Sequence, residues 1–274
     1  MHARSRSLLA QAVTRKVSSK QSHRIRSFCV IAVSLLLFCC TLLSADKPVS
    51  SFSPGKTHIV LVGDSTVTDN AGWGKGFARA FKDDVEVINL SKGGRSSKSA
   101  IAEGMLKKAI ELKPDYILIQ FVHNDQHGHG ADRETDPQTT YKQYMTQYVD
   151  EARAAGIKPV LVTSLSRRQW GADGKIHSTL TPNADVVKQI AADKKVPLID
   201  LHARSIEKYE AMGKVKVLEI SPSKNADPTN PNADTSGQTV DGTHLNEKGS
   251  QLFGPIVAKE LKAAVPELAS HVKD

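Results

Sequence analysis

The sequence predicts an α/β protein built on a parallel, doubly wound β-sheet. From residue 56 onward, short aliphatic and β-branched runs recur, each apolar enough to be buried on both faces. Segments with helical periodicity separate these runs. Strands that are joined by helices run parallel in one sheet, with the helices packed on its faces. We find no internal repeat and no second core, so one domain is expected.

The predicted elements alternate along the chain. Strands are expected at residues 59–62, 85–90, 116–121, 159–163 and 197–200. Helices are expected at residues 73–82, 99–112, 139–155, 183–193 and 247–264. Two polar stretches, 123–138 and 221–242, are longer than ordinary connections, which is typical of functional loops or of disorder.

The first 45 residues have a composition of their own. Seven Lys and Arg residues precede an apolar run at 28–43, a small-residue stretch follows, and no acidic residue occurs before Asp46. This order is typical of a secretory signal peptide. The apolar run is shorter than the roughly 20 residues that span a bilayer, which favours cleavage over an uncleaved anchor. The sequence therefore predicts a signal peptide at 1–45, a linker at 46–55, the domain at 56–264 and a tail at 265–274, in a secreted or periplasmic protein.

The basic charge of the chain belongs to that N-terminal segment. The whole sequence has 37 basic and 29 acidic residues, and removal of the seven N-terminal basic residues leaves 30 against 29. A nearly neutral domain gives no support to nucleic-acid binding. All three cysteines, Cys29, Cys39 and Cys40, also precede residue 46. The predicted mature domain thus has no thiol for a disulfide, a zinc site or a nucleophile.

Polar residues follow the first three predicted strands at their carboxyl ends: Ser65, then Gly93-Gly94, then His123-Asn124. In open α/β sheets these ends meet at the edge where ligands bind. Near the C-terminus, a spacing of three would place Asp241 and His244 on one face of a helical turn. A carboxylate that holds one imidazole nitrogen leaves the other free to accept a hydroxyl proton. Taken singly, Ser65 is as well explained by a turn, and the Asp-x-x-His pair by a helix N-terminus.

The order of these motifs resembles that of the SGNH (GDSL-type) hydrolase superfamily, and within it most closely that of rhamnogalacturonan acetylesterases and their bacterial relatives. The matching segments cover residues 56–264 and are VGDSTV (62–67), GWG (72–74), NLSKGGRSS (89–97), HNDQ (123–126), DRETDP (132–137) and DGTHLNEKG (241–249). The resemblance implies a flavodoxin-like three-layer α/β/α sandwich with a five-stranded parallel sheet. It also implies ester hydrolysis without a cofactor.

Carried over to this sequence, the resemblance makes Ser65 the nucleophile, His244 the general base and then acid, and Asp241 its orienting partner. The implied oxyanion hole consists of the main-chain N–H groups of Ser65 and Gly94 and the side-chain amide of Asn124. One position departs from the family pattern, because Val122 stands where glycine is usual.

Two other interpretations use the same loops. His123, His127 and His129, with Asp125 and Asp132 nearby, have a spacing that a metal would accept, although a solvated loop explains them better. We therefore expect no metal site. The segment SKGGRSSKS (91–99) suggests a non-enzymatic phosphate- or nucleotide-binding module, but it lacks the P-loop spacing.

The substrate is inferred from residues near the same edge. Arg95, Arg168 and Trp170 follow strand ends, and His123 lies in the third motif. Guanidinium groups bind carboxylates and indole rings stack on sugars, so we expect these four residues to bind substrate. The alternative is that the arginines are solvated surface charges and that Trp170 packs in a loop. No apolar lid is evident. The sequence predicts a secreted serine esterase that removes acetyl groups from rhamnogalacturonan- or pectin-like polysaccharide, and a general short-chain esterase or lipase is the alternative. No nucleic-acid partner is expected, and no membrane association after signal cleavage.

Overall fold

The computed structural model describes residues 52–224 and 239–273. In these residues the main sheet consists of β1 (Thr57–Gly63), β2 (Val85–Asn89), β3 (Tyr116–Gln120), β4 (Lys158–Val162) and β5 (Leu198–Ile199). The strand order is β2-β1-β3-β4-β5, and every neighbouring pair is parallel. The predicted five-stranded parallel sheet is confirmed, and each predicted strand boundary lies within two residues of the observed one.

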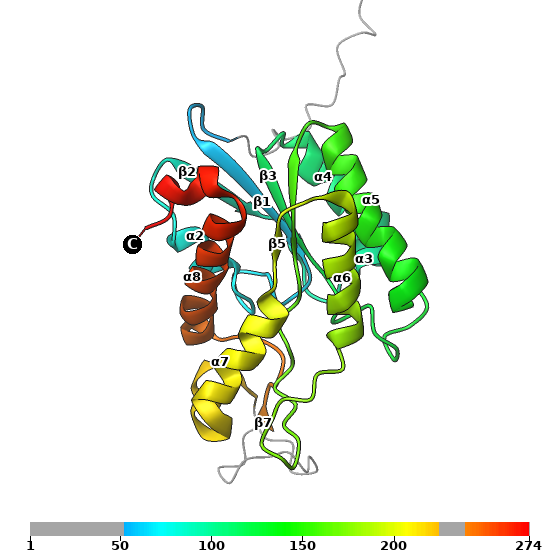
Figure 1. Ribbon diagram of the computed structural model, residues 1–274, viewed down its shortest axis with the longest axis vertical. Helices are drawn as coiled ribbons and strands as arrows, with labels where there is room; N and C mark the ends of the chain where they lie inside the picture. The colour runs from blue at the N-terminus through cyan, green and yellow to red at the C-terminus, as the bar shows by residue number, and fades with distance from the viewer. Residues whose placement is uncertain (1–51, 225–238, 274) are drawn as a thin grey trace, which may run out of the picture. The chain divides into compact units, whose positions relative to one another are not determined.

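Helices cover both faces of this sheet (Figure 1). One face packs against α2 (Gly74–Arg79), α7 (Leu201–Lys216) and α8 (Glu247–Ala264). The other packs against α3 (Ser97–Ala102), α4 (Met105–Glu111), α5 (Lys142–Ala154) and α6 (Thr181–Lys194). Along β1 the side chains alternate between the two cores, with Ile59 and Leu61 in one and Val60 and Val62 in the other. A strand buried on both faces explains the uninterrupted apolar run in the sequence.

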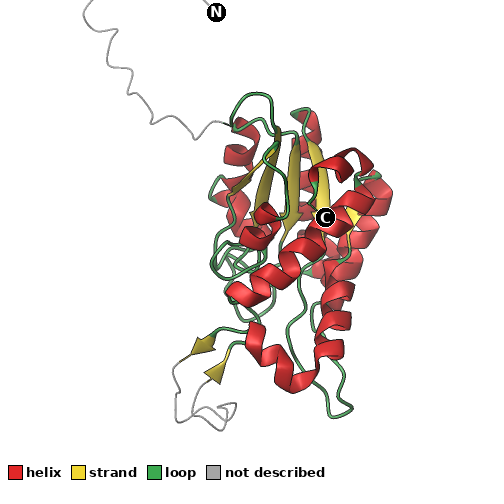
Figure 2. Ribbon diagram, turned by 90° about the vertical axis from the view of Figure 1, so that its left-hand side faces the viewer, coloured by secondary structure: helices red, strands yellow, loops and turns green. Residues whose placement is uncertain are grey.

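Short elements complete the fold. They are the π-helical turn η1 (Pro137–Tyr141) and the 3-10 turns η2 (Val217–Ile220) and η3 (Pro266–His271). A separate antiparallel pair, β6 (Ser223–Lys224) and β7 (Thr239–Val240), lies apart from the main sheet (Figure 2). The polar stretch 221–242 contains this pair, and its residues 225–238 lie outside the described part of the chain.

The helices differ from the prediction in three places. The helix expected at 99–112 is two helices, because Gly104 adopts a φ of 77° between α3 and α4. The helix expected at 139–155 begins with η1 before continuing as α5. Helix α7 was not predicted. It follows the two-residue β5 directly and is interrupted at Gly213, so its periodic pattern is short and broken.

The ends of the domain also extend further than expected. Val265, Leu268 and Val272 are buried in the core on the α8 side, and Val272 forms a bridge with Phe81. Residues predicted as a tail therefore pack as part of the domain. The predicted signal peptide at 1–45 lies outside the described residues. Within 52–224 and 239–273, the helices are too short or too polar to span a bilayer.

Helices α2 and α8 touch through glycines. A Cβ atom added to Gly254 would lie 2.1 Å from the carbonyl carbon of Gly76, and one added to Gly76 would lie 1.9 Å from the Ser250 carbonyl oxygen. The main chains are therefore in direct contact. The Gly76 N–H donates a hydrogen bond of 3.1 Å to Ser250 Oγ across the same interface. This contact joins the loop after β1 to the helix that follows His244.

Candidate active site

The loop after β1 is organised by the carboxylate of Asp64, which is completely buried. Its Oδ1 atom accepts hydrogen bonds from the Thr66 N–H (2.9 Å) and hydroxyl (2.7 Å). Its Oδ2 atom accepts from the N–H groups of Val122 and His123, each at 3.3 Å. Asp64 therefore fixes the turn that carries Ser65 and ties it to the loop after β3.

Two further hydrogen bonds between buried side chains, Trp73 to Gln120 and Gln120 to Thr66, support the turn that carries Ser65. Gln120, at the end of β3, donates from Nε2 to Thr66 Oγ1 at 2.7 Å. Its Oε1 atom accepts from the indole N–H of Trp73 at 2.9 Å. Each polar group is satisfied, which is the condition under which a buried polar network stabilises one conformation. The GWG segment of the sequence thus contributes a structural support for the nucleophile turn.

Asp241 and His244 lie in a turn between β7 and α8. The Oδ1 atom of Asp241 accepts from the N–H groups of Thr243 (2.7 Å) and His244 (3.0 Å). Its Oδ2 atom lies 2.7 Å from Nδ1 of His244. Residues 241–244 form a turn that is held by the Asp241 side chain, and they do not form the helical turn that the spacing suggests. Burial opposes ionisation of Asp241, but the hydrogen bonds from the His244 ring and from these two N–H groups prevail and hold its pKa well below the usual range.

Ser65 and His244 meet across the fold. The Nε2 atom of His244 lies 2.7 Å from Oγ of Ser65, although 179 positions separate the two residues. The Leu245 N–H also donates to the Ala71 carbonyl at 2.9 Å, which ties the turn to the loop after β1. The structure thus brings together the three predicted catalytic residues in the order hydroxyl, imidazole, carboxylate. This is the arrangement of an activated nucleophile, its base and the group that orients the base.

Apart from Ser65 itself, the predicted oxyanion donors lie in the loops that follow β2 and β3. Gly94 has a φ of 77°, a conformation that favours glycine, in a loop tied to β1 by the Lys92 N–H, which donates to the Gly63 carbonyl at 3.1 Å. The Asn124 amide donates from Nδ2 to the Arg95 carbonyl at 3.0 Å. An amide NH₂ has two hydrogens, so one N–H of Asn124 stays available for a substrate. Val122 does not have a positive φ, so no glycine conformation is required there.

Asp125, which in the sequence is only a neighbour of a possible metal site, is a structural carboxyl. It is completely buried and accepts from the Ser97 N–H (3.0 Å), from the Ser97 hydroxyl and from the Thr135 hydroxyl (3.0 Å). Burial raises its pKa to about 7. Asp125 connects the start of α3, just after the Gly94 loop, with the Asn124 loop. The sequence feature that could have indicated this role is the position of Asp125 directly after Asn124 in the HNDQ motif.

Arg168 lies beneath the catalytic turn. Its side chain is buried, and Nη2 donates to the main-chain carbonyls of Asp241 and His244, both at 2.6 Å. Its Nη1 atom donates to the Tyr209 hydroxyl at 3.3 Å, and its guanidinium lies over the Tyr209 ring. This placement differs from the substrate-binding position expected from sequence, because both terminal guanidinium nitrogens donate to protein oxygens, while the buried Nε atom has no partner among the described residues. Arg168 holds the turn that carries His244.

Of the other three residues expected to bind substrate, Arg95 and Trp170 contact other parts of the protein. Arg95 donates from Nε to both carboxylate oxygens of Glu103 at 3.0 Å, and from Nη1 to the Gly93 carbonyl. Trp170 pairs with Ile176 in a bridge, and the Lys214 ammonium lies over its ring.

His123 is 4% exposed, and burial lowers its pKa to about 4. Neither ring nitrogen of His123 has a hydrogen-bond partner of good geometry, although the Leu165 carbonyl lies near enough to favour the protonated ring. The His123 ring is therefore buried and neutral at ordinary pH.

The loop histidines do not gather around a common point. Nδ1 of His127 lies 3.0 Å from the Glu134 carboxylate, and the His127 side chain is fully exposed. Among the residues that the structure describes, no group of three or more His, Cys, Asp or Glu side chains is placed to hold a metal ion.

Comparisons with known proteins bear on this arrangement. A family model described as the GDSL-like Lipase/Acylhydrolase family matches residues 61–252. The chain belongs to this family. The match begins inside β1 and ends inside α8, so it includes all three residues of the hydrogen-bonded triad. Family membership makes the chain a carboxylic ester hydrolase and decides against the phosphate-binding module considered from sequence.

Two curated relatives come from Bacillus subtilis (strain 168). Rhamnogalacturonan acetylesterase RhgT is 38% identical over 228 residues, covering 79% of this chain and 93% of RhgT. The probable rhamnogalacturonan acetylesterase YesY is 34% identical over 229 residues, covering 79% of this chain and 98% of YesY. Among solved structures, the Bacillus subtilis protein YXIM has a TM-score of 0.58 and 23% identity, and the alignment covers 76% of this chain and 56% of that one. The last comparison supports the fold alone.

Proposed function

We propose that this protein is an exported acetylesterase that removes acetyl groups from rhamnogalacturonan-type polysaccharide through an acyl-enzyme on Ser65. The observation that carries the mechanism is the continuous contact from Ser65 Oγ to His244 Nε2 and from His244 Nδ1 to Asp241, each 2.7 Å long. The substrate class is supported by RhgT and YesY, which are named for this activity. Export is supported by the basic and apolar segments that precede Asp46.

The first half of the reaction forms the acyl-enzyme. Ser65 Oγ attacks the acetyl carbonyl carbon while His244 Nε2 takes the hydroxyl proton. The negative charge passes to the carbonyl oxygen, which the N–H groups of Ser65, Gly94 and Asn124 receive as hydrogen-bond donors. The tetrahedral intermediate then collapses. The bond to the sugar oxygen breaks, and His244 returns the proton to that oxygen, so the deacetylated sugar leaves and acetate stays esterified to Ser65.

The second half releases acetate by the same steps with water as the nucleophile. His244 takes a proton from water, the hydroxide adds to the acetyl carbon, and the same donors hold the oxyanion. Collapse breaks the bond to Ser65 Oγ, which recovers its proton from His244. Asp241 stays ionised throughout, since its lowered pKa lets it stabilise the imidazolium that forms in both halves.

The test is acetate release from acetylated rhamnogalacturonan, with acetylated xylan and p-nitrophenyl acetate in parallel. Ser65→Ala should lose activity on all three, while Ser270→Ala, an exposed serine of η3, serves as the matched control. A serine-directed phosphonate should add its mass to the peptide that contains Ser65. Activity on p-nitrophenyl acetate without activity on either polysaccharide would support a general short-chain esterase instead. Full activity of Ser65→Ala would reject the mechanism.

A further inference from the structure

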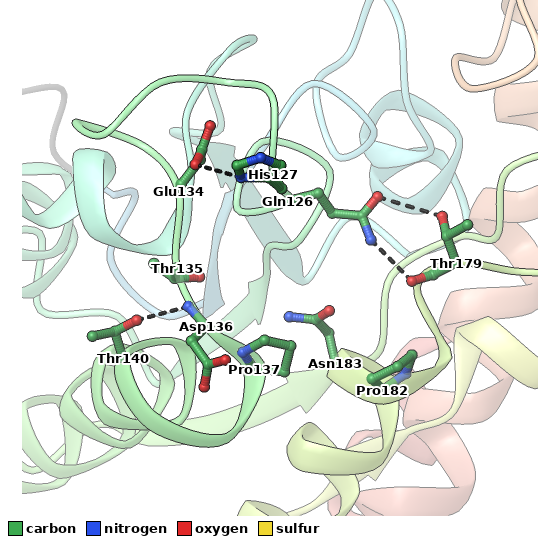
Figure 3. A pocket seen from close by; sticks show the side chains of 10 residues that line it. All are labelled: Gln126, His127, Glu134, Thr135, Asp136, Pro137, Thr140, Thr179, Pro182 and Asn183. Carbon is green, nitrogen blue, oxygen red and sulfur yellow. Dashed lines mark hydrogen bonds and ion pairs between the residues drawn. The ribbon is translucent and has the colours of Figure 1, made fainter.

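A cavity of about 450 Å³ opens beside the Asn124 loop (Figure 3). Its wall is formed by the loop after β3, by η1 and by the beginning of α6. Its volume is within the range of roughly 300–1,000 Å³ that is typical of small-ligand sites. None of the residues assigned to the triad or to the oxyanion hole lines this cavity.

The cavity wall and the candidate oxyanion loop form one hydrogen-bonded framework. Thr135, which lines the cavity, donates its N–H (2.8 Å) and its hydroxyl (3.0 Å) to Asp125, the neighbour of Asn124. Arg167 joins the same two parts, because Nη1 donates to the cavity residue Gln126 and Nη2 donates to the His123 carbonyl at 3.2 Å. A ligand in the cavity would therefore lie on the same loop that is predicted to stabilise the reacting ester.

Asn183 points to a ligand. It lies in the first turn of α6, is 4% exposed and lines the cavity. Its amide has no hydrogen-bond partner among the described residues. Figure 3 shows this amide directed across the cavity towards the side of Asp136 and Pro137. Because the accessible amide atoms of Asn183 open onto the cavity, a ligand that both donates and accepts hydrogen bonds would bond to them.

The charges around the cavity select against anions. The carboxylates of Glu134 and Asp136 line it, and no Lys or Arg side chain does. Asp136 uses Oδ1 to accept from the Gln138 and Thr139 N–H groups, which leaves Oδ2 without a partner in the described structure. A uronate carboxylate would face these charges, and the nearby Arg167 guanidinium lies behind the wall with Nη1 bonded to Gln126 and to the Thr179 hydroxyl (3.4 Å). Two proline rings, Pro137 and Pro182, add apolar surface suited to the C–H face of a sugar.

We propose that this cavity is a subsite for a neutral, hydroxyl-rich sugar residue next to the residue that carries the acetyl ester. A sugar hydroxyl donates to Asp136 Oδ2, and a second hydroxyl exchanges hydrogen bonds with the Asn183 amide. The proposal rests on the proposed function, because it assigns one residue of the same polysaccharide. In this proposal the substrate is selected by the Asn183 amide and the Asp136 carboxylate, and not by Arg95 and Arg168, which the sequence suggested.

Binding to the Ser65→Ala protein tests the subsite without catalysis. The probes are a deacetylated rhamnogalacturonan tetrasaccharide, which contains neutral and uronic residues, and tetragalacturonate, which contains uronic residues only. Calorimetry should show binding of the first at least about tenfold tighter than binding of the second. Equal affinities, or no binding of the first, would overturn the proposal. Because acetate release is not measured, failure of the esterase assignment would be seen separately, in the activity assay above.

The variant Asn183→Ala, made in the Ser65→Ala background, tests the amide itself. Loss of one to two hydrogen bonds should weaken binding of the rhamnogalacturonan tetrasaccharide about tenfold. Gln189→Ala, which removes an exposed amide from the same helix, should not change the affinity. The thermal midpoint distinguishes a binding role from a structural one, because removal of an amide without partners should not lower Tm. Unchanged affinity in Asn183→Ala, or a fall in both affinity and Tm, would contradict the assignment.

Discussion

The guanidinium of Arg168 holds the main chain of His244, with Nη2 2.6 Å from the His244 carbonyl oxygen. The same Nη2 atom lies 2.6 Å from the Asp241 carbonyl oxygen, and the Arg168 N–H donates to the Gly242 carbonyl at 2.8 Å. Three main-chain oxygens of the catalytic turn are therefore bound by one residue. A rigid support of this kind sets the position of the imidazole relative to Ser65.

Replacement of Arg168 should impair catalysis through the position of His244. We expect Arg168→Lys to lower kcat on p-nitrophenyl acetate about tenfold to a hundredfold with little change in KM, because displacement of a catalytic group by about 1 Å has effects of this size. Arg153→Lys is the matched control, since Arg153 is exposed and also donates to a main-chain carbonyl. The loss should be equal for charged and neutral acetylated substrates. A loss confined to uronate-containing substrates would show instead that Arg168 binds the carboxylate.

Asn124→Ala should lower kcat while KM changes less. Its free N–H is predicted to bind charge that develops only after the substrate is bound, and loss of one such donor typically costs roughly 10²–10³ in rate. Steady-state kinetics on p-nitrophenyl acetate separate the two constants. An increase in KM at constant kcat would show that Asn124 binds the ground state.

Asp125 should make stability depend on pH in an unusual direction. Its folded pKa of about 7 lies above the ordinary value of 3.8, so between these values the folded state holds a proton that the unfolded state has lost. This contribution to stability is complete below about pH 4 and is lost as pH rises through about 7, with a slope of at most about 1.4 kcal/mol per pH unit. His123, whose pKa is lowered to about 4, contributes the opposite slope.

The difference between wild type and Asp125→Asn isolates the Asp125 contribution from that of His123. Urea unfolding at pH 4.5, 5.5, 6.5 and 7.5 should show the advantage of wild type shrinking as pH rises. A constant difference over this range would mean that Asp125 is ionised in the folded protein throughout.

Gly254→Ala should destabilise the protein even though alanine favours helix by about 1 kcal/mol. The new Cβ would lie 2.1 Å from the Gly76 carbonyl carbon, so α2 and α8 must separate. We expect a loss of about 1–3 kcal/mol in the free energy of unfolding, which is usual for overpacking. Lys259→Ala, at an exposed position of the same helix, should be close to neutral. A neutral Gly254→Ala would show that the interface can open at little cost.

The sheet could be predicted because it depends on local patterns, whereas the triad was assigned from the family resemblance of several ordered motifs, each of which has another explanation when taken singly. A strand buried on both faces must be apolar throughout, and a polar loop at its carboxyl end is visible in the same window, as at Ser65. Helix α7 was missed because its pattern is broken at Gly213, and the division between α3 and α4 depends on the positive φ of Gly104. Such dihedral angles are permitted by glycine but not dictated by it.

The residues around the triad are held by contacts between side chains that lie far apart in the sequence. The hydrophobic periodicity of a sequence does not predict such contacts. Arg168 was assigned to substrate from its place after a strand, but its guanidinium reaches carbonyls 73 and 76 positions away. Asn183 was placed only as the start of a helix, and nothing in its sequence neighbourhood shows that its amide lacks a partner. These roles follow from packing between elements.

The glycine contact between α2 and α8 also links completion of the proposed triad to the docking of α8. Ser65 follows the first strand of the described domain, whereas His244 immediately precedes α8, and that helix reaches the Ser65 side of the fold only by seating Gly254 on Gly76. A chain that lacks residues 241–264 contains Ser65 but neither the proposed base nor its orienting carboxylate. The proposed triad is therefore complete only after α8 has docked on α2.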